Sequence, residues 1–228
     1  MIPASAGPPR VAYPERDGNP MADNTLQFRW IVTLQGNLDL LFRDTPDVFV
    51  AGDNLIYPVA GSNTVRVAPD VYVAFGRPKG DRGSYRVSEE GGIFPQVIFE
   101  VLSPGNRSGE LARKFTFYER HGAEEYYILN PDRVTLEGYV RRGNELADID
   151  EMDGWVSPRM GIRFAVGDDV AVFYPDGRPF LTFLQLGDLQ QETARRADAE
   201  RARADAAEKR ADALAAKLRE LGIKLNGE

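Results

Sequence analysis

The chain has 228 residues, of which 43% are hydrophobic and 10% aromatic, enough for one packed domain with appendages or for two small domains. It contains no cysteine and one histidine, which excludes disulfides, cysteine nucleophiles and histidine-rich metal sites. The net charge of −7 argues against nucleic-acid binding through a large basic face. Neither a secretory signal nor an apolar run of about 18 residues occurs, so we expect a cytoplasmic protein without a membrane segment.

Residues 1–22 are rich in proline, which fixes the backbone and removes an amide donor. We predict that this segment is an extended or disordered arm, with the alternative that it wraps a partner subunit. Its prolines are Pro3, Pro8, Pro9, Pro14 and Pro20.

Residues 23–185 form the predicted main domain, in which helical and strand periods alternate. Asp23 or Asn24 can cap a first helix, whose apolar residues from Ile31 to Leu41 recur at helical spacing. A second helix is predicted over residues 108–121, with Ser108 as its cap and Gly122 just past its end. Turns are expected at residues 130–133 and 142–144. Predicted strands lie within residues 47–52, 55–59, 65–75, 95–103, 125–130 and 134–140.

This order of elements predicts an α/β fold, a mixed β-sheet flanked by helices. Residues 186–228 then change character, because alanine and charged residues dominate. From Gly187 onward nine basic and nine acidic residues balance, so the net charge belongs to the preceding part. We predict a helical tail that pairs as a coiled coil, with a single solvated helix as the alternative. The heptad core positions are Leu186, Gln190, Thr193, Ala197, Glu200, Ala204, Ala207, Ala211, Leu214, Leu218, Leu221 and Leu225.

Two acidic residues interrupt strand-like runs. Asp70 follows Pro69 within residues 65–75, and Glu100 lies inside a nearly continuous apolar run typical of a strand buried on both faces. A buried carboxylate needs a partner, a metal ion or a raised pKa, and two acids on neighbouring strands can share a divalent cation. The alternatives are that Asp70 caps a turn and that Glu100 is half exposed on an edge strand.

Lys114 is the third unusual residue. On a helical wheel it falls between Phe117 and Tyr118 on the apolar face of the second helix. A short loop connects the Glu100 strand to this helix, so Lys114 can return to the end of that strand. Alternatively, its stem covers apolar residues or it forms a purely structural pair with Glu100.

Other candidates carry weaker signals. The basic segment 77–86 either contacts backbone phosphates or is a solvated loop. Glu89 and Glu90 either add an acid to the site or belong to a surface turn. For His121, at the end of its helix, a dipole-stabilising or capping role is favoured over catalysis. Asp39 on the first helix has unknown surroundings.

At these residues the sequence resembles the Uma2 family, bacterial proteins described as restriction endonucleases within the PD-(D/E)xK nuclease superfamily. The resemblance covers roughly residues 23–185. It implies a restriction-endonuclease-like core. Its most specific parts are Pro69-Asp70, Glu100-Val101-Leu102-Ser103-Pro104, Lys114, Tyr118 and Glu125-Tyr126-Tyr127.

The resemblance implies metal-assisted hydrolysis of phosphodiester bonds in nucleic acid, with DNA favoured. Asp70, Glu100 and the carbonyl of Val101 would bind Mg²⁺, with Mn²⁺ as a substitute. Leu102 occupies the usual lysine position, and the family pattern implies that Lys114 takes over that role.

We expect a homo-oligomer, with a dimer favoured, assembled through the C-terminal helix. The competing interpretation is a non-catalytic scaffold that retains the nuclease fold and recruits partners through its tail. A third is an enzyme that acts on another phosphorylated substrate.

Overall fold

In the computed structural model, residues 11–15, 18, 22–105 and 108–220 are described, except for the side chain of Ser108. The chain divides into two units, Met1–Phe180 and Leu181–Glu228. Part of the predicted arm (residues 1–10, 16–17 and 19–21), the Ser108 side-chain cap, and heptad positions 221 and 225 lie outside this description.

The first unit is built on a six-stranded sheet in its described residues, with the strand order β1-β3-β5-β6-β7-β8. β5 and β6 are parallel, and all other neighbours are antiparallel. The apolar runs of β3, β5 and β6 occupy the middle, because strands buried on both faces need no polar side. The predicted mixed sheet is confirmed. Its strands are β1 (Val48–Ala51), β3 (Val71–Phe75), β5 (Val97–Val101), β6 (Glu125–Asn130), β7 (Thr135–Arg142) and β8 (Glu145–Asp148).

Helix α1 (Thr25–Leu41) covers one face of this sheet. Asn24 is its N-cap and accepts a hydrogen bond from the amide of Gln27 at 2.8 Å, as predicted. Ile31, Leu34 and Leu38 form the buried stripe of the helix, against alternate residues of β3 and β5. Strands β9 (Arg163–Val166) and β10 (Val170–Phe173) form a separate hairpin whose apolar residues join this layer.

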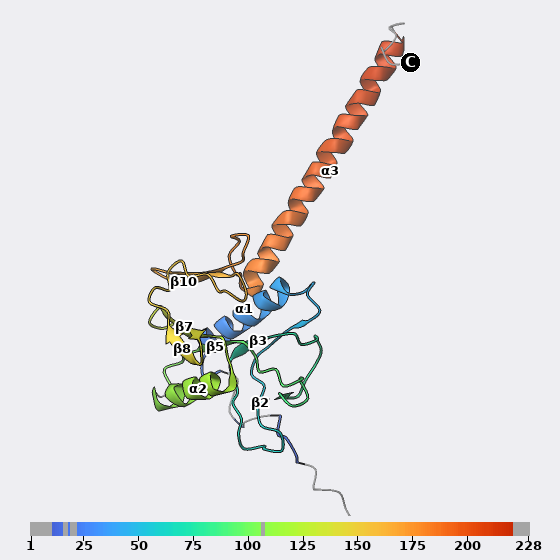
Figure 1. The fold of residues 1–228 in the computed structure, drawn as a ribbon. Helices are drawn as coiled ribbons and strands as arrows, with labels where there is room; N and C mark the ends of the chain where they lie inside the picture. The colour runs from blue at the N-terminus through green and yellow to red at the C-terminus, as the bar shows by residue number, and fades with distance from the viewer. Residues whose placement is uncertain (1–10, 16–17, 19–21, 106–107, 221–228) are drawn as a thin grey trace, which may run out of the picture. The chain divides into compact units, whose positions relative to one another are not determined.

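Helix α2 (Ser108–His121) connects the parallel strands β5 and β6 and covers the opposite face (Figure 1). The helix ends at His121 and is followed, as predicted, by Gly122, whose φ of +99° favours glycine and whose amide donates to the Tyr118 carbonyl. The short parallel pair β2 (Ile56–Tyr57) and β4 (Tyr85–Arg86) adds Ile56 and Tyr85 to this layer. Helices therefore flank both faces of the sheet, as predicted.

Some strands differ from the sequence prediction. The expected strand over residues 65–75 is divided at Pro69: Val67 forms an isolated bridge with Ile56, and β3 begins only at Val71. Strands β4, β8, β9 and β10 had no sequence prediction, because they are short and their apolar alternation covers few residues. The predicted turns are confirmed, with Asn130 accepting from the Arg133 amide and Gly143 at φ +66°.

Residues 11–14 lie against the segment 57–63. The Tyr57 hydroxyl donates to the carbonyl of Pro14 at 2.6 Å, and the Tyr13 hydroxyl accepts from the amide of Gly61 at 2.9 Å. The rings of Tyr13 and Tyr57 meet edge to face at 5.0 Å. Residues 11–14 of the predicted arm thus pack against the segment 57–63 of the first unit.

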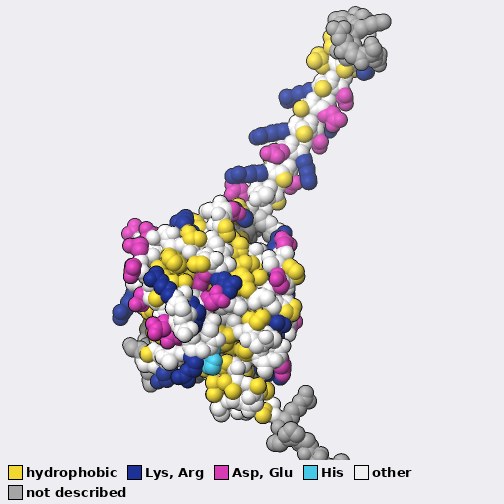
Figure 2. Space-filling view, in the orientation of Figure 1, with side chains coloured by type: hydrophobic (Ala, Val, Ile, Leu, Met, Phe, Trp, Pro, Cys, Tyr) yellow, Lys and Arg dark blue, Asp and Glu magenta, His cyan; other side chains and the backbone are white. Residues whose placement is uncertain are grey.

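The second unit is helix α3 (Phe183–Glu220), 38 residues long. None of its described residues is buried, and basic and acidic side chains alternate along it (Figure 2). The predicted helix is confirmed, and its pairing as a coiled coil stays a prediction. No helix in the described ranges combines the length and apolar character needed to span a membrane.

Candidate active site

Asp70 and Glu100 come together at the junction of β3 and β5. Val71 pairs with Phe99 in the antiparallel register, so one further step places Asp70 opposite Glu100. Side chains alternate between the faces of a sheet, and both acids belong to the face that α2 covers. The Asp70 carboxylate accepts a hydrogen bond from the amide of Val101 at 2.6 Å. The structure thus brings together the two acids singled out in the sequence, and their role as a shared site stays a prediction.

Glu100 is 3% exposed and belongs to an inner strand, so the alternative of a half-exposed edge position is wrong. Both of its carboxylate oxygens accept hydrogen bonds. The Tyr118 hydroxyl donates to Oε1 at 2.6 Å, and the Lys114 ammonium donates to Oε2 at 2.7 Å. Since an unpaired buried charge is costly, these two donors from α2 are what permit a carboxylate at this depth.

Lys114 reaches back from α2 to the sheet, as the helical wheel predicted. Besides Glu100, its ammonium contacts the Ala68 carbonyl at 3.1 Å. Burial lowers the pKa of Lys114, but the negative charges of Glu100 and Asp70 outweigh burial, and its pKa is raised above 10.5. Lys114 therefore carries a fixed positive charge at neutral pH, and its role in catalysis stays a prediction.

At Asp70, by contrast, burial outweighs the effect of the neighbouring positive charge on the pKa. Burial is the largest influence and raises its pKa well above 3.8, and the charge of Glu100 raises it further. Lys114 and the Val101 amide lower the pKa but do not compensate. Two carboxylates thus share a site in which one lysine supplies the positive charge.

The Val101 carbonyl, implied by the resemblance as a metal ligand, accepts from the side-chain amide of Gln27 at 2.7 Å. Gln27 is 5% exposed, and its oxygen accepts from the Asp23 amide at 2.8 Å. Sequence reasoning missed Gln27. The sequence does contain a signal for Gln27, because Asn24 and Gln27 have the spacing of a capping box. In this structure the side-chain amide of Gln27 also donates to the sheet, at Val101.

These residues fit a hard divalent cation that keeps much of its water. No cluster of three or more His, Cys, Asp or Glu side chains occurs in the described part of the chain. The protein ligands that the family resemblance implies are Asp70, Glu100 and the second lone pair of the Val101 carbonyl. Mg²⁺ is the cation that commonly binds through one or two carboxylates plus water.

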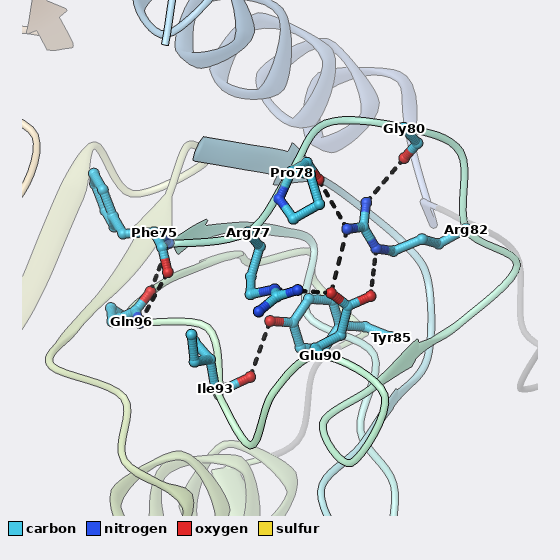
Figure 3. Close-up of polar contacts among 9 residues, drawn as sticks. All are labelled: Phe75, Arg77, Pro78, Gly80, Arg82, Tyr85, Glu90, Ile93 and Gln96. Atoms are coloured by element: carbon cyan, nitrogen blue, oxygen red, sulfur yellow. Dashed lines mark hydrogen bonds and ion pairs between the residues drawn. The ribbon is translucent and has the colours of Figure 1, made fainter. Parts of the chain in front are cut away.

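Glu90, a candidate from the sequence, lies outside this site. Its carboxylate accepts from Arg82 at 2.6 Å and from Arg77 at 3.0 Å (Figure 3). Burial raises the pKa of Glu90, but the hydrogen bonds and charges of Arg82 and Arg77 together lower it. Arg82 also lies over the Phe49 ring at 3.9 Å. The two arginines of the basic segment thus bind an internal acid, which argues against their use as phosphate contacts.

His121 and Asp39 have structural surroundings. The ring of His121 contacts Phe117 at 4.5 Å and Phe94 at 5.8 Å between centroids. Burial lowers the pKa of His121, with a smaller contribution from Arg120. His121 thus packs between aromatic rings at the end of α2, and its dipole-stabilising or capping role stays a prediction. Asp39 forms a surface ion pair with Lys79 at 3.7 Å.

Glu125 is a second buried acid, and it lies on the opposite face of the sheet from Glu100. It accepts from Tyr127 at 2.8 Å, from Ser157 at 2.5 Å and from the amide of Arg159 at 2.6 Å. Burial raises its pKa despite these donors. This carboxylate anchors residues 157–159 to β6, so we assign it a structural role.

A cavity of about 380 Å³ adjoins the site. Lys114 and Ala68, which meet beside Glu100, belong to its wall. The site therefore has an adjacent space that can receive a ligand. The lining residues are Leu55, Arg66, Val67, Ala68, Glu110, Arg113, Lys114 and Phe117.

Comparisons with known proteins identify the family of this chain. Among solved structures, the chain is similar to a "putative nuclease belonging to DUF820" from Anabaena variabilis, with 15% identity and a TM-score of 0.39 over 57% of this chain and 70% of that one. No curated protein matches. The model of the Uma2 family, described as "Putative restriction endonuclease", matches residues 10–171. Because that span exceeds half of the sequence, the chain belongs to the Uma2 family.

Proposed function

We propose that this protein hydrolyses phosphodiester bonds of nucleic acid, with DNA favoured, at the site formed by Asp70, Glu100 and Lys114. The observation that carries the proposal is the buried carboxylate pair, whose members face each other across β3 and β5 beside a fixed ammonium. Family membership supports the same chemistry.

Asp70, Glu100 and the Val101 carbonyl would hold Mg²⁺, or Mn²⁺ in its place. When bound, such an ion polarises the scissile phosphate and lowers the pKa of a coordinated water. The chain's own contribution is positioning. The Tyr118 hydroxyl and the Gln27 amide fix Glu100 and the Val101 carbonyl, respectively.

Lys114 has a separate role in this proposal. It stabilises the negative charge that develops on the phosphate, or it orients the attacking water. Leu102 stands in the usual lysine position of the superfamily motif, but Lys114 Nζ lies 2.7 Å from Glu100 although it comes from α2. This distance supports the migration of the lysine to the helix. The acidic net charge of −7 implies a modest, salt-sensitive affinity for nucleic acid.

The test combines calorimetric titration of Mg²⁺ and Mn²⁺ with a nicking assay on supercoiled plasmid and on circular single-stranded DNA. Wild type should bind metal and cleave, whereas Glu100→Gln should lose both, because its neutral amide cannot ligate the cation as a carboxylate does. Glu89→Gln, a change at an exposed glutamate, is the matched control and should retain both activities. Wild type that neither binds metal nor cleaves would overturn the proposal.

A second candidate function is a non-catalytic scaffold. It is favoured by the complete hydrogen bonding of Glu100, whose oxygens are satisfied by Tyr118 and Lys114 without a metal ion. In this case α3, which has no buried side chain among its described residues, would recruit partners or a second copy. Metal binding without cleavage of either DNA would instead point to a different phosphorylated substrate.

A further inference from the structure

The cavity beside Lys114 has two different walls. One is formed by Leu55 and the segment 66–68, and the other by α2. The α2 residues are Glu110, Arg113, Lys114 and Phe117, spaced at i, i+3, i+4 and i+7. That spacing places them on one helical face, so the cavity follows a continuous strip of α2.

Positive charge gathers on this cavity although the protein is acidic. Arg66, Arg113 and Lys114 line it together with one acid, Glu110. Lys114 is already bound to Glu100 and to a backbone carbonyl. Arg66 and Arg113 form no ion pair within the described ranges. Arg66 makes one long contact, 3.4 Å, to the Asn63 carbonyl. Both guanidinium groups are therefore available to an anion, and a guanidinium suits phosphate geometry.

The other residues that line the cavity are apolar. Leu55, Val67 and the ring of Phe117 line the cavity, and Phe117 is only partly buried. Aromatic rings that stack with bases beside cationic side chains are the usual means of binding single strands. A volume of about 380 Å³ lies at the small end of the range for pockets that hold one small ligand. A single nucleotide fits this scale.

We propose that this cavity binds one unpaired nucleotide of a nucleic-acid strand. Arg66 and Arg113 bind its phosphate, and its base lies against Phe117, so that the neighbouring phosphodiester reaches Lys114. This inference rests on the proposed function and narrows its substrate class to single-stranded or locally unpaired nucleic acid. The predicted preference for single strands follows from the cationic and aromatic side chains that line the cavity together.

The test measures binding separately from hydrolysis. Fluorescence anisotropy of the full-length protein with a labelled oligothymidylate, and with a duplex of equal length, is recorded in EDTA over a salt series. Wild type should bind the single strand more tightly than the duplex. The double variant Arg66→Ala/Arg113→Ala should weaken binding about tenfold or more and reduce the salt slope by about 0.7, the contribution of the one phosphate that both arginines bind on a single strand. Arg120→Ala, on the same helix but outside the cavity, is the matched control.

Phe117→Leu tests the base contact, because leucine keeps apolar volume but lacks a ring face. It should weaken single-strand binding about tenfold with an unchanged salt slope, and its thermal unfolding verifies that the core persists. The proposal is overturned if the double variant binds like Arg120→Ala, if duplex binds as tightly as single strand, or if wild type binds neither. Single-strand binding with the expected variant losses but no cleavage in Mg²⁺ or Mn²⁺ would uphold the cavity and reject the proposed hydrolysis.

Discussion

At the scale of single residues, Asp70 and Glu100 combine desolvation with mutual repulsion. Glu100 has two donors from α2, whereas the one hydrogen bond described for Asp70 comes from the Val101 amide. Burial and Glu100 accordingly raise the pKa of Asp70. Such unfavourable electrostatics is typical of a functional site, where stability is lost so that a ligand can bind.

Asp70→Asn should therefore stabilise the protein at neutral pH while removing a metal ligand. Since the folded pKa of Asp70 is raised, the folded state binds more protons than the unfolded state at pH values above 3.8 and below the raised value. The contribution of Asp70 to the free energy of unfolding thus decreases as pH rises through that window. In the variant this pH-dependent decrease should be absent. Urea unfolding over a pH series measures the effect, with the exposed Asp132→Asn as control. A variant less stable than wild type at pH 7 would contradict the electrostatic account.

At the scale of elements, α2 carries two of the groups that hold Glu100, so the helix and β5 form one functional unit. Tyr118 and Lys114 lie four residues apart on α2 and both reach the same carboxylate. The neighbouring Tyr126 on β6 is fully buried, and its hydroxyl has no hydrogen-bond partner within the described residues. The rings of Tyr118 and Tyr126 lie 5.1 Å apart, but only the Tyr118 hydroxyl forms a hydrogen bond within the described residues.

This difference provides a matched pair of substitutions. Tyr118→Phe should lower the free energy of unfolding by about 1.5–3 kcal/mol, the cost of a lost hydrogen bond to a charged group. Tyr126→Phe removes a hydroxyl without a partner and should be neutral or slightly stabilising. Urea unfolding of both variants measures the difference. Equal losses of stability would show that the Tyr118–Glu100 bond contributes little.

At the scale of the whole molecule, α3 is the element through which we expect copies of the chain to associate. A helix of 38 residues extends about 57 Å, and its exposed surface includes Leu214. The leucines of the predicted seam concentrate toward its C-terminal part, and opposite charges alternate along its length (Figure 2). This pattern favours a second copy of the same helix as the partner.

We expect a homo-oligomer, a dimer in the simplest case, in light scattering of the full chain. Leu214→Glu combined with Leu218→Glu should reduce the measured mass to that of one chain, because charges at the seam oppose pairing. Deletion of the residues after 186 should have the same effect and leave the first unit folded. Leu189→Glu, outside the heptad seam and half exposed, is the control. Identical masses for all these forms would show that the seam does not pair.

Local patterns in the sequence were sufficient to predict the helices and the inner strands. They were also sufficient to single out Asp70, Glu100 and Lys114. Strand alternation and helical period are properties of neighbouring residues, so they can be read without the fold. They could not identify the contact of Gln27 with Val101, 74 residues away, or the enclosure of Glu90 by Arg77 and Arg82.

Those contacts follow from which strands pair and which loops pack together, which depends on the whole chain. The hydrogen-bond pairing of Tyr118 with Glu100 and the cavity beside Lys114 likewise exist only once α2 lies on the sheet. The sequence by itself thus determined the residue types and their faces. Tertiary structure alone decided which charges are satisfied and which stay available to a ligand, because burial and pairing are properties of packed surfaces.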